Sequence, residues 1–99
     1  MFDGKRYATK GVTETIPEYL QNLLWYIIEI MEVPQKDYLQ VFKLEEINDN
    51  GKVRQKITHI QEQPAYRKEH IITVKGAVNA KVYVIDDGDH STMLLPEEY

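Results

Sequence analysis

The chain has 99 residues, contains no cysteine and carries a net charge of −4. This length suits one domain with a core of its own, residues 1–99, and the lack of cysteine excludes disulfides, thiolate zinc sites and thiol nucleophiles. The negative charge argues against general binding to nucleic acid, which needs clustered Lys and Arg.

The N-terminal residues predict a short strand. Residues 5–12, KRYATKGV, contain the β-favouring residues Tyr7, Thr9 and Val12 and end near Gly11. Charged residues follow Met1 and no long apolar run succeeds them, so neither a secretory signal nor a membrane span is expected. We therefore expect a cytoplasmic protein.

Residues 15–33, TIPEYLQNLLWYIIEIMEV, carry the only long helical pattern, which Pro34 ends. Wound at about 100° per residue, the apolar side covers more than half of the helix. Such a wide side predicts deep burial against a sheet. Its members are Leu20, Leu23, Leu24, Ile27, Ile28 and Met31, widened by Ile16, Tyr19, Tyr26, Ile30 and Val33.

The single tryptophan, Trp25, lies on the polar side of this helix, beside Glu18, Asn22, Glu29 and Glu32. Two interpretations follow. A loop or the C-terminal tail covers the ring, or Trp25 is a partner-binding anchor surrounded by Glu18, Asn22 and Glu29, because tryptophan is enriched at interface hot spots.

Residues 38–63 predict a β-hairpin, since two alternating segments flank the turn sequence Asn-Asp-Asn-Gly at 48–51. A two-residue turn at Asn50 and Gly51 would place Glu45 opposite Lys56. A three-residue loop would instead place Ile47 opposite Val53, and both registers pair charges sensibly.

Strands are predicted in three further segments, 65–74, 79–88 and 92–95. The segment 79–88, which contains Val82 and Val84, has the composition of a central strand. We therefore predict an α+β fold in which one long helix in the N-terminal half packs on a mainly antiparallel sheet of four or five strands. One helix cannot cover both apolar faces of such a sheet. Either loops and the C-terminal tail cover the second face, or a homodimer forms through it.

Two clusters suggest chemistry. Asp86, Asp87, Asp89 and His90 could ligate a divalent cation, but Asp-Gly-Asp after a strand is also turn chemistry, and we favour a structural turn. Basic residues on the hairpin arm could contact nucleic acid, although acidic residues opposite should neutralise many of them. These basic residues are Lys52, Arg54 and Lys56, followed at a distance by Arg67 and Lys68.

Three segments also carry a resemblance to a known family. They are KRYATKGV, DYLQVF and above all NAKVYVIDDGDHSTMLLPEEY at the C-terminus. Over nearly its full length the chain resembles a family of short bacterial proteins known only as a domain of unknown function, the family numbered nine hundred and sixty. The resemblance implies Gram-positive bacteria and their mobile elements, and it brings no catalytic or binding residues.

No complete catalytic constellation emerges from the sequence. His59 and His70 lack an accompanying nucleophile, and the glycines are scattered singly rather than in a phosphate-binding loop. The sequence leaves the function unknown. It favours a small non-catalytic cytoplasmic module that binds another protein, without cofactor or metal. The two alternatives are a metal-assisted or acid-base enzyme that uses the cluster from Asp86 to His90, and a nucleic-acid-binding module that uses the basic hairpin arm.

Overall fold

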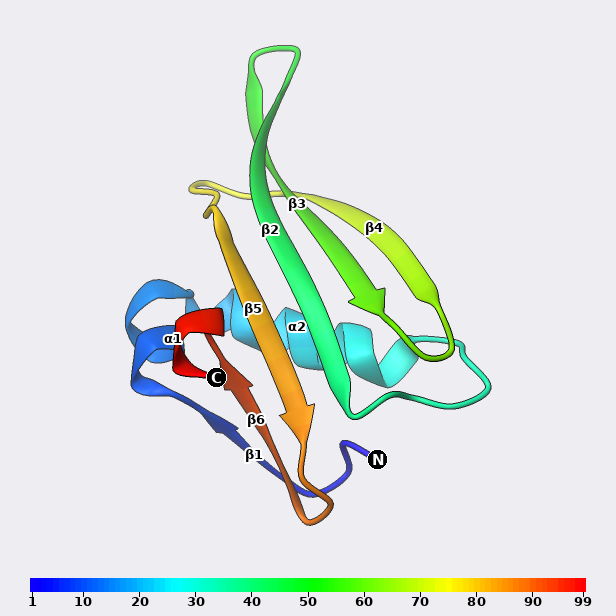
Figure 1. Cartoon of the computed structure of the whole chain (residues 1–99). Coiled ribbons are helices and arrows are strands. Elements are labelled where there is room, and N and C mark those ends of the chain that lie inside the picture. Colours follow the sequence, from blue (N-terminus) through cyan, green and yellow to red (C-terminus); the bar gives the residue numbers. More distant parts are fainter.

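A six-stranded sheet with a long helix across one face makes up the protein (Figure 1). The computed structural model describes residues 1–99. The elements in chain order are β1 (Lys5–Ala8), α1 (Lys10–Thr15), α2 (Glu18–Ile30), β2 (Leu39–Asp49), β3 (Lys52–Gln61), β4 (Tyr66–Thr73), β5 (Ala80–Asp86), β6 (His90–Leu94) and the short 3-10 helix η1 (Pro96–Glu98).

The strands lie in the order β1-β6-β5-β2-β3-β4, so the first and last strands of the chain pair at one edge. All neighbours run antiparallel except β1 and β6, which are parallel. The α+β class is therefore confirmed. The predicted four or five strands must be corrected to six, because the short segments at the two ends of the chain form β1 and β6, which pair with each other.

The N-terminal region also departs from the prediction of one strand over residues 5–12. Strand β1 ends at Ala8, and Thr9 then starts α1 as its N-cap, with its hydroxyl oxygen accepting from the Val12 backbone N–H at 3.3 Å. Val12 is fully buried on this extra turn of helix. The protein thus has two helices, and the signal for the first was an N-cap threonine within a β-favouring stretch.

Helix α2 begins directly after Pro17 and ends at Ile30, because Met31 adopts an extended conformation with a ψ of 138°. It therefore ends three residues before Val33, the last residue of the apolar run that Pro34 closes. Its inner side buries Leu20, Leu24, Ile27 and Ile28. These residues form one cluster with Phe42 and Leu44 of β2, Ile57 of β3, Val82 and Val84 of β5, and Met93 of β6.

The β2–β3 hairpin is confirmed, and the structure decides its register. Asn50 and Gly51 both have positive φ, 53° and 84°, as a two-residue type I′ turn requires. Glu45 therefore faces Lys56, which is the first of the two registers that the sequence allowed. The hairpin tip extends beyond the rest of the sheet (Figure 1).

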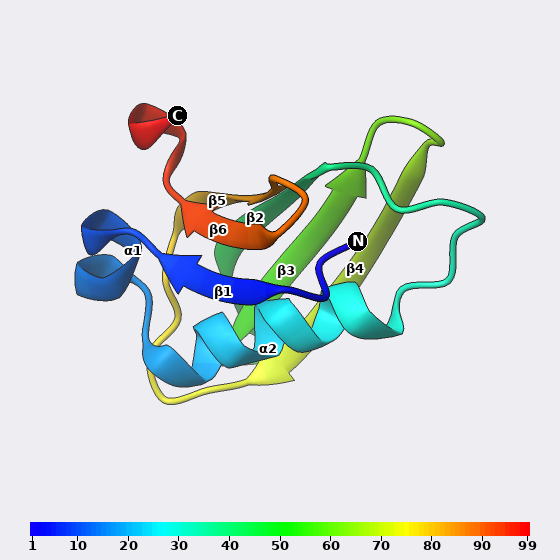
Figure 2. The same ribbon diagram turned by 90° about the horizontal axis from the view of Figure 1, so that it is seen from below.

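No helix covers the second face of the sheet (Figure 2). A row of apolar residues crosses four strands in register on this face: Leu94, Tyr83, Val41 and Ile60. The C-terminus covers part of it, since the Tyr99 ring meets the Tyr83 ring edge to face at 5.7 Å. A homodimer through this face stays a prediction.

The inner side of α2 should dominate the stability of the domain. We expect Leu24→Ala and Ile27→Ala each to lower the free energy of unfolding by about 2–5 kcal/mol, because both leave a cavity. Tyr26→Ala is the matched control on the same helix: its side chain is exposed, so the change should cost about 0.5 kcal/mol or less. Urea denaturation measures all three, and equal costs at buried and exposed positions would contradict this packing.

Candidate functional site

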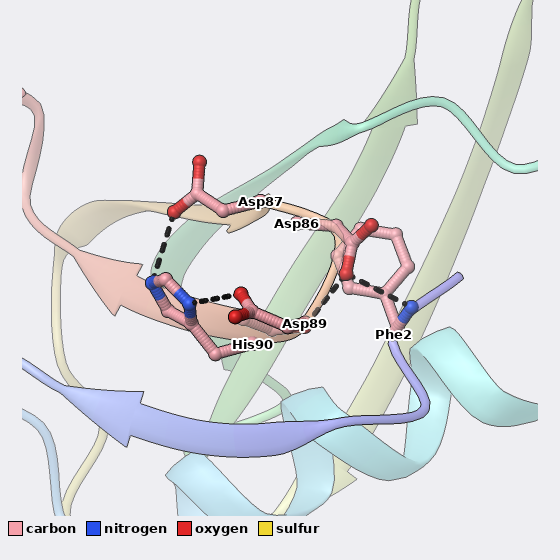
Figure 3. A network of polar contacts seen from close by, with 6 residues as sticks. Phe2, Asp86, Asp87, Asp89 and His90 are labelled. Atoms are coloured by element: carbon pink, nitrogen blue, oxygen red, sulfur yellow. Dashed lines mark hydrogen bonds and ion pairs between the residues drawn. The ribbon is translucent and has the colours of Figure 1, made fainter.

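The turn between β5 and β6 holds the candidate metal ligands (Figure 3). His90 lies between two carboxylates: its Nδ1 is 2.9 Å from Asp89 Oδ1 and its Nε2 is 3.2 Å from Asp87 Oδ2. Asp86 turns away from them and accepts from the Phe2 backbone N–H and from the Ser91 hydroxyl, both at 3.2 Å. The turn thereby ties the N-terminus to the β5–β6 hairpin.

The geometry of this cluster suits an ion pair. The neighbouring Asp89 carboxylate raises the pKa of His90, and the His90 imidazole in turn lowers the pKa of Asp89. No group of three His, Cys, Asp or Glu side chains in the protein has an arrangement that could hold a metal ion. The structural interpretation of the turn accounts for the contacts of all four residues.

Trp25 lies on the flank of α2 that faces β1 and is only 7% exposed. The Arg6 guanidinium of β1 sits 5.0 Å from the centre of its ring and also donates to Glu29 Oε1 at 2.6 Å. The ring is therefore covered from within the chain, but by a strand rather than by a loop or the tail. Such burial does not suit an exposed anchor; Glu18, Asn22 and Glu29 remain exposed, and a partner-binding role for them stays a prediction.

The basic residues of the hairpin arm are largely engaged by acidic neighbours. Arg54 lies 3.3 Å from Asp49, and Lys56 lies 3.2 Å from Glu69. Arg67 shares the same Glu69 carboxylate at 3.2 Å. Three of the five basic residues are thus paired, whereas Lys52 and Lys68 have no ion-pair partner.

A chain of buried polar side chains, missed by the sequence analysis, ties loops to the sheet. His59 Nε2 donates to Gln40 Oε1 at 2.6 Å, and Gln40 donates to Gln61 Oε1 at 2.7 Å. Gln61 also bonds the backbone of the segment between α2 and β2, and Gln55 does the same for the loop before β5. Burial lowers the pKa of His59 to about 4, so this histidine is neutral at pH 7.

These glutamines hold loops to the sheet, and hydrophobic residues are few in the lining of the surface hollows. The largest hollow, about 540 Å³, is lined by Met1, Gln35, Lys36, Asp37, Tyr38, Gln63 and Pro64. A small-molecule site is usually a mostly apolar cleft with a few convergent polar groups. This hollow has only two hydrophobic residues in its lining, so it does not match that description.

A row of apolar side chains lies exposed on the outer flank of α2. Tyr19, Tyr26 and Ile30 are 48%, 54% and 47% exposed, and the partly buried Leu23 completes the row, which we call the α2 stripe. From the sequence, these residues were expected on the buried side of the helix. They are exposed because the sheet covers α2 on one side only (Figure 2), and no second layer reaches the flank opposite β1.

Comparisons with other proteins agree with this fold. The sequence model of a family described as staphylococcal protein of unknown function (DUF960) matches residues 5–98. A crystal structure of a protein of unknown function from Enterococcus faecalis is similar, with 31% sequence identity and a TM-score of 0.72 over 98% of this chain and 92% of that one. No curated protein matches the chain.

Neither helix is long and apolar enough to cross a lipid bilayer.

The ion pairs of His90 should stabilise the fold only where the imidazole is protonated. Its pKa is raised in the folded state, so this contribution is complete below the unfolded pKa of about 6.5 and is lost as the pH rises through the folded pKa. We expect His90→Asn to lower the urea midpoint relative to the wild type more at about pH 5.5 than at about pH 8.5. A difference between the two proteins that is independent of pH would contradict this assignment.

The covering of Trp25 by Arg6 is testable by fluorescence. Trp25 should emit to the blue of a water-exposed indole, and Arg6→Ala should shift the emission to the red because it removes the guanidinium above the ring. Lys5→Ala is the control, since Lys5 is the neighbouring basic residue on the opposite face of β1. Trp25→Ala should cost about 3–5 kcal/mol. An unshifted spectrum in Arg6→Ala would show that the strand does not cover the ring.

Proposed function

We propose that this chain, which belongs to the family of staphylococcal proteins of unknown function DUF960, is a non-catalytic cytoplasmic module that binds another protein. The single observation behind the proposal is the α2 stripe. Three large apolar side chains that are each about half exposed, on one helix of a small domain, are the pattern of a docking surface.

The composition of the α2 stripe supports the proposal further. Tyrosine is enriched in interface hot spots, because its ring contributes apolar area and its hydroxyl tolerates water when the partner is absent. Both Tyr19 and Tyr26 lie on rigid helix turns whose inner side is held by the core, so little order is lost on binding. The stripe is therefore preorganised.

The enzyme alternative has less support. Its proposed centre, from Asp86 to His90, uses its carboxylates for contacts with His90, Phe2 and Ser91. The nucleic-acid alternative is weakened by the ion pairs on the hairpin arm. Neither alternative uses the exposed apolar side chains of α2.

A pull-down with matched variants tests the proposal. Immobilised wild-type protein should retain a stoichiometric protein from a native lysate, and the double variant Tyr26→Ser, Ile30→Ser should lose it while keeping the wild-type unfolding midpoint. Ile71→Ser is the control, because Ile71 is 52% exposed but lies on the opposite face of the sheet. Retention of the same protein by the double variant would contradict the proposal, and tightly bound metal in the purified protein would favour the enzyme alternative.

A further inference from the structure

The spacing of the α2 stripe indicates what kind of partner fits it. Its residues stand at positions 19, 23, 26 and 30, which are separated by four, three and four residues. This alternation is the repeat with which one helix presents a seam to another. From Tyr19 to Ile30 the seam is roughly 16 Å long, which is about three helical turns. A partner helix of similar length would match it, with anchors spaced as in helix-in-groove recognition.

The charges on α2 separate two candidate partners. Helix α2 contains no Lys or Arg, and its exposed flank carries Glu18 and Glu29, followed by Glu32 just after its end. Arg6 pairs with Glu29, whereas Glu18 and Glu32 have no ion-pair partner. An unpaired carboxylate therefore lies near each end of the stripe. On its other flank α2 itself carries no charged residue, because Leu20 and Ile27 are buried there, and β4 places the exposed Lys68 on the sheet face that α2 covers.

This arrangement disfavours a second copy of the chain on the stripe. If two copies paired through antiparallel α2 helices, Glu18 of one copy would lie near Glu32 of the other. If the helices were parallel, the flank with these residues would face the other flank of the partner copy, where α2 carries no Lys or Arg. The antiparallel arrangement places carboxylate beside carboxylate, which is destabilising, and the parallel one gives neither Glu18 nor Glu32 a basic residue of α2 as a partner.

We propose that the α2 stripe binds a basic amphipathic helix of another protein, which places apolar residues on Tyr19, Leu23, Tyr26 and Ile30 and sets Lys or Arg beside Glu18 and Glu32. This inference rests on the proposed function and adds the chemical class of the partner. The apolar seam supplies the affinity, and the carboxylates at the two ends of the helix select the charge of the partner and suppress pairing of two copies.

Designed peptides serve as the probes. Two labelled peptides of about 18 residues carry the same Leu and Ile seam with four-three spacing, one flanked by Lys and the other by Glu. Fluorescence anisotropy with the full chain should show the Lys peptide binding at least about tenfold more tightly than the Glu peptide. Equal binding of the two, or tighter binding of the Glu peptide, would overturn the proposed partner class.

Matched variants locate the binding. Ile30→Ser should weaken the Lys peptide about tenfold or more, whereas Ile71→Ser should leave its affinity unchanged, since the two isoleucines are similarly exposed on different surfaces. The double variant Glu18→Lys, Glu32→Lys should reverse the preference between the peptides. Binding that survives Ile30→Ser would be general attraction between an acidic protein and a basic peptide, and it would overturn the site.

Light scattering and the pull-down separate this inference from the proposed function. By light scattering, the wild-type protein should not form a dimer through the stripe. A wild-type dimer that becomes monomeric in the stripe variant Tyr26→Lys would mean that a second copy occupies the stripe, and it would contradict the inference. If the pull-down yields a stripe-dependent partner while the Glu peptide binds more tightly than the Lys peptide, the proposed function stands and only the partner class is wrong. If both peptides and the lysate fail to bind, both proposals fail.

Discussion

The burial of one side of α2 against the sheet is the contact on which the rest of the structure depends. Leu20, Leu24 and Ile28 fill the space below β2 and β5, where Val82 and Val84 are fully buried. Because α2 crosses the strands (Figure 1), it brings elements from both ends of the chain into one core. Without that surface, a six-stranded sheet would expose two apolar faces and leave the edge strand β1 held only by its four-residue pairing with β6.

Polar side chains inside the domain fix the segments that the apolar core does not reach. The segment between α2 and β2 and the loop before β5 are irregular, and both depend on buried glutamines for their backbone hydrogen bonds. Buried backbone groups need partners, and an amide side chain provides a donor and an acceptor together. His59 takes part as a neutral ring stacked on Phe42 at 4.4 Å between centroids. Sheet and connections therefore form one unit.

Local sequence patterns carried most of the fold. The alternation in residues 38–63 and the Asn-Gly turn predicted the hairpin, and the helical repeat predicted α2. Strands were predicted at both ends of the chain, but the parallel pairing of β1 with β6 escaped, because it joins residues as far apart in the sequence as Lys5 and His90. Helix α1 escaped because a capping threonine lies among β-favouring residues.

The candidate site was predictable only in part. The turn chemistry of Asp86 to His90 could be read from residue types, whereas the covering of Trp25 required knowing that β1 runs beside α2. The wide apolar side of α2 was visible in the sequence, but a helical wheel does not show how much of that side one sheet covers. Gln55 and Gln61 share one face of β3 with the core residue Ile57, and this position in the strand repeat was the available signal that they are buried.

Helix α2 has two apolar sides, one that packs in the core and one that is exposed. The chain contains no cysteine, so a single introduced thiol reports on its position alone. In native protein, the thiol of Tyr26→Cys should react with a thiol reagent almost as fast as a thiol in a short peptide. The thiol of Leu24→Cys should react at least about a hundredfold more slowly, because the reagent reaches it only when the domain opens. Equal rates at the two positions would contradict the account.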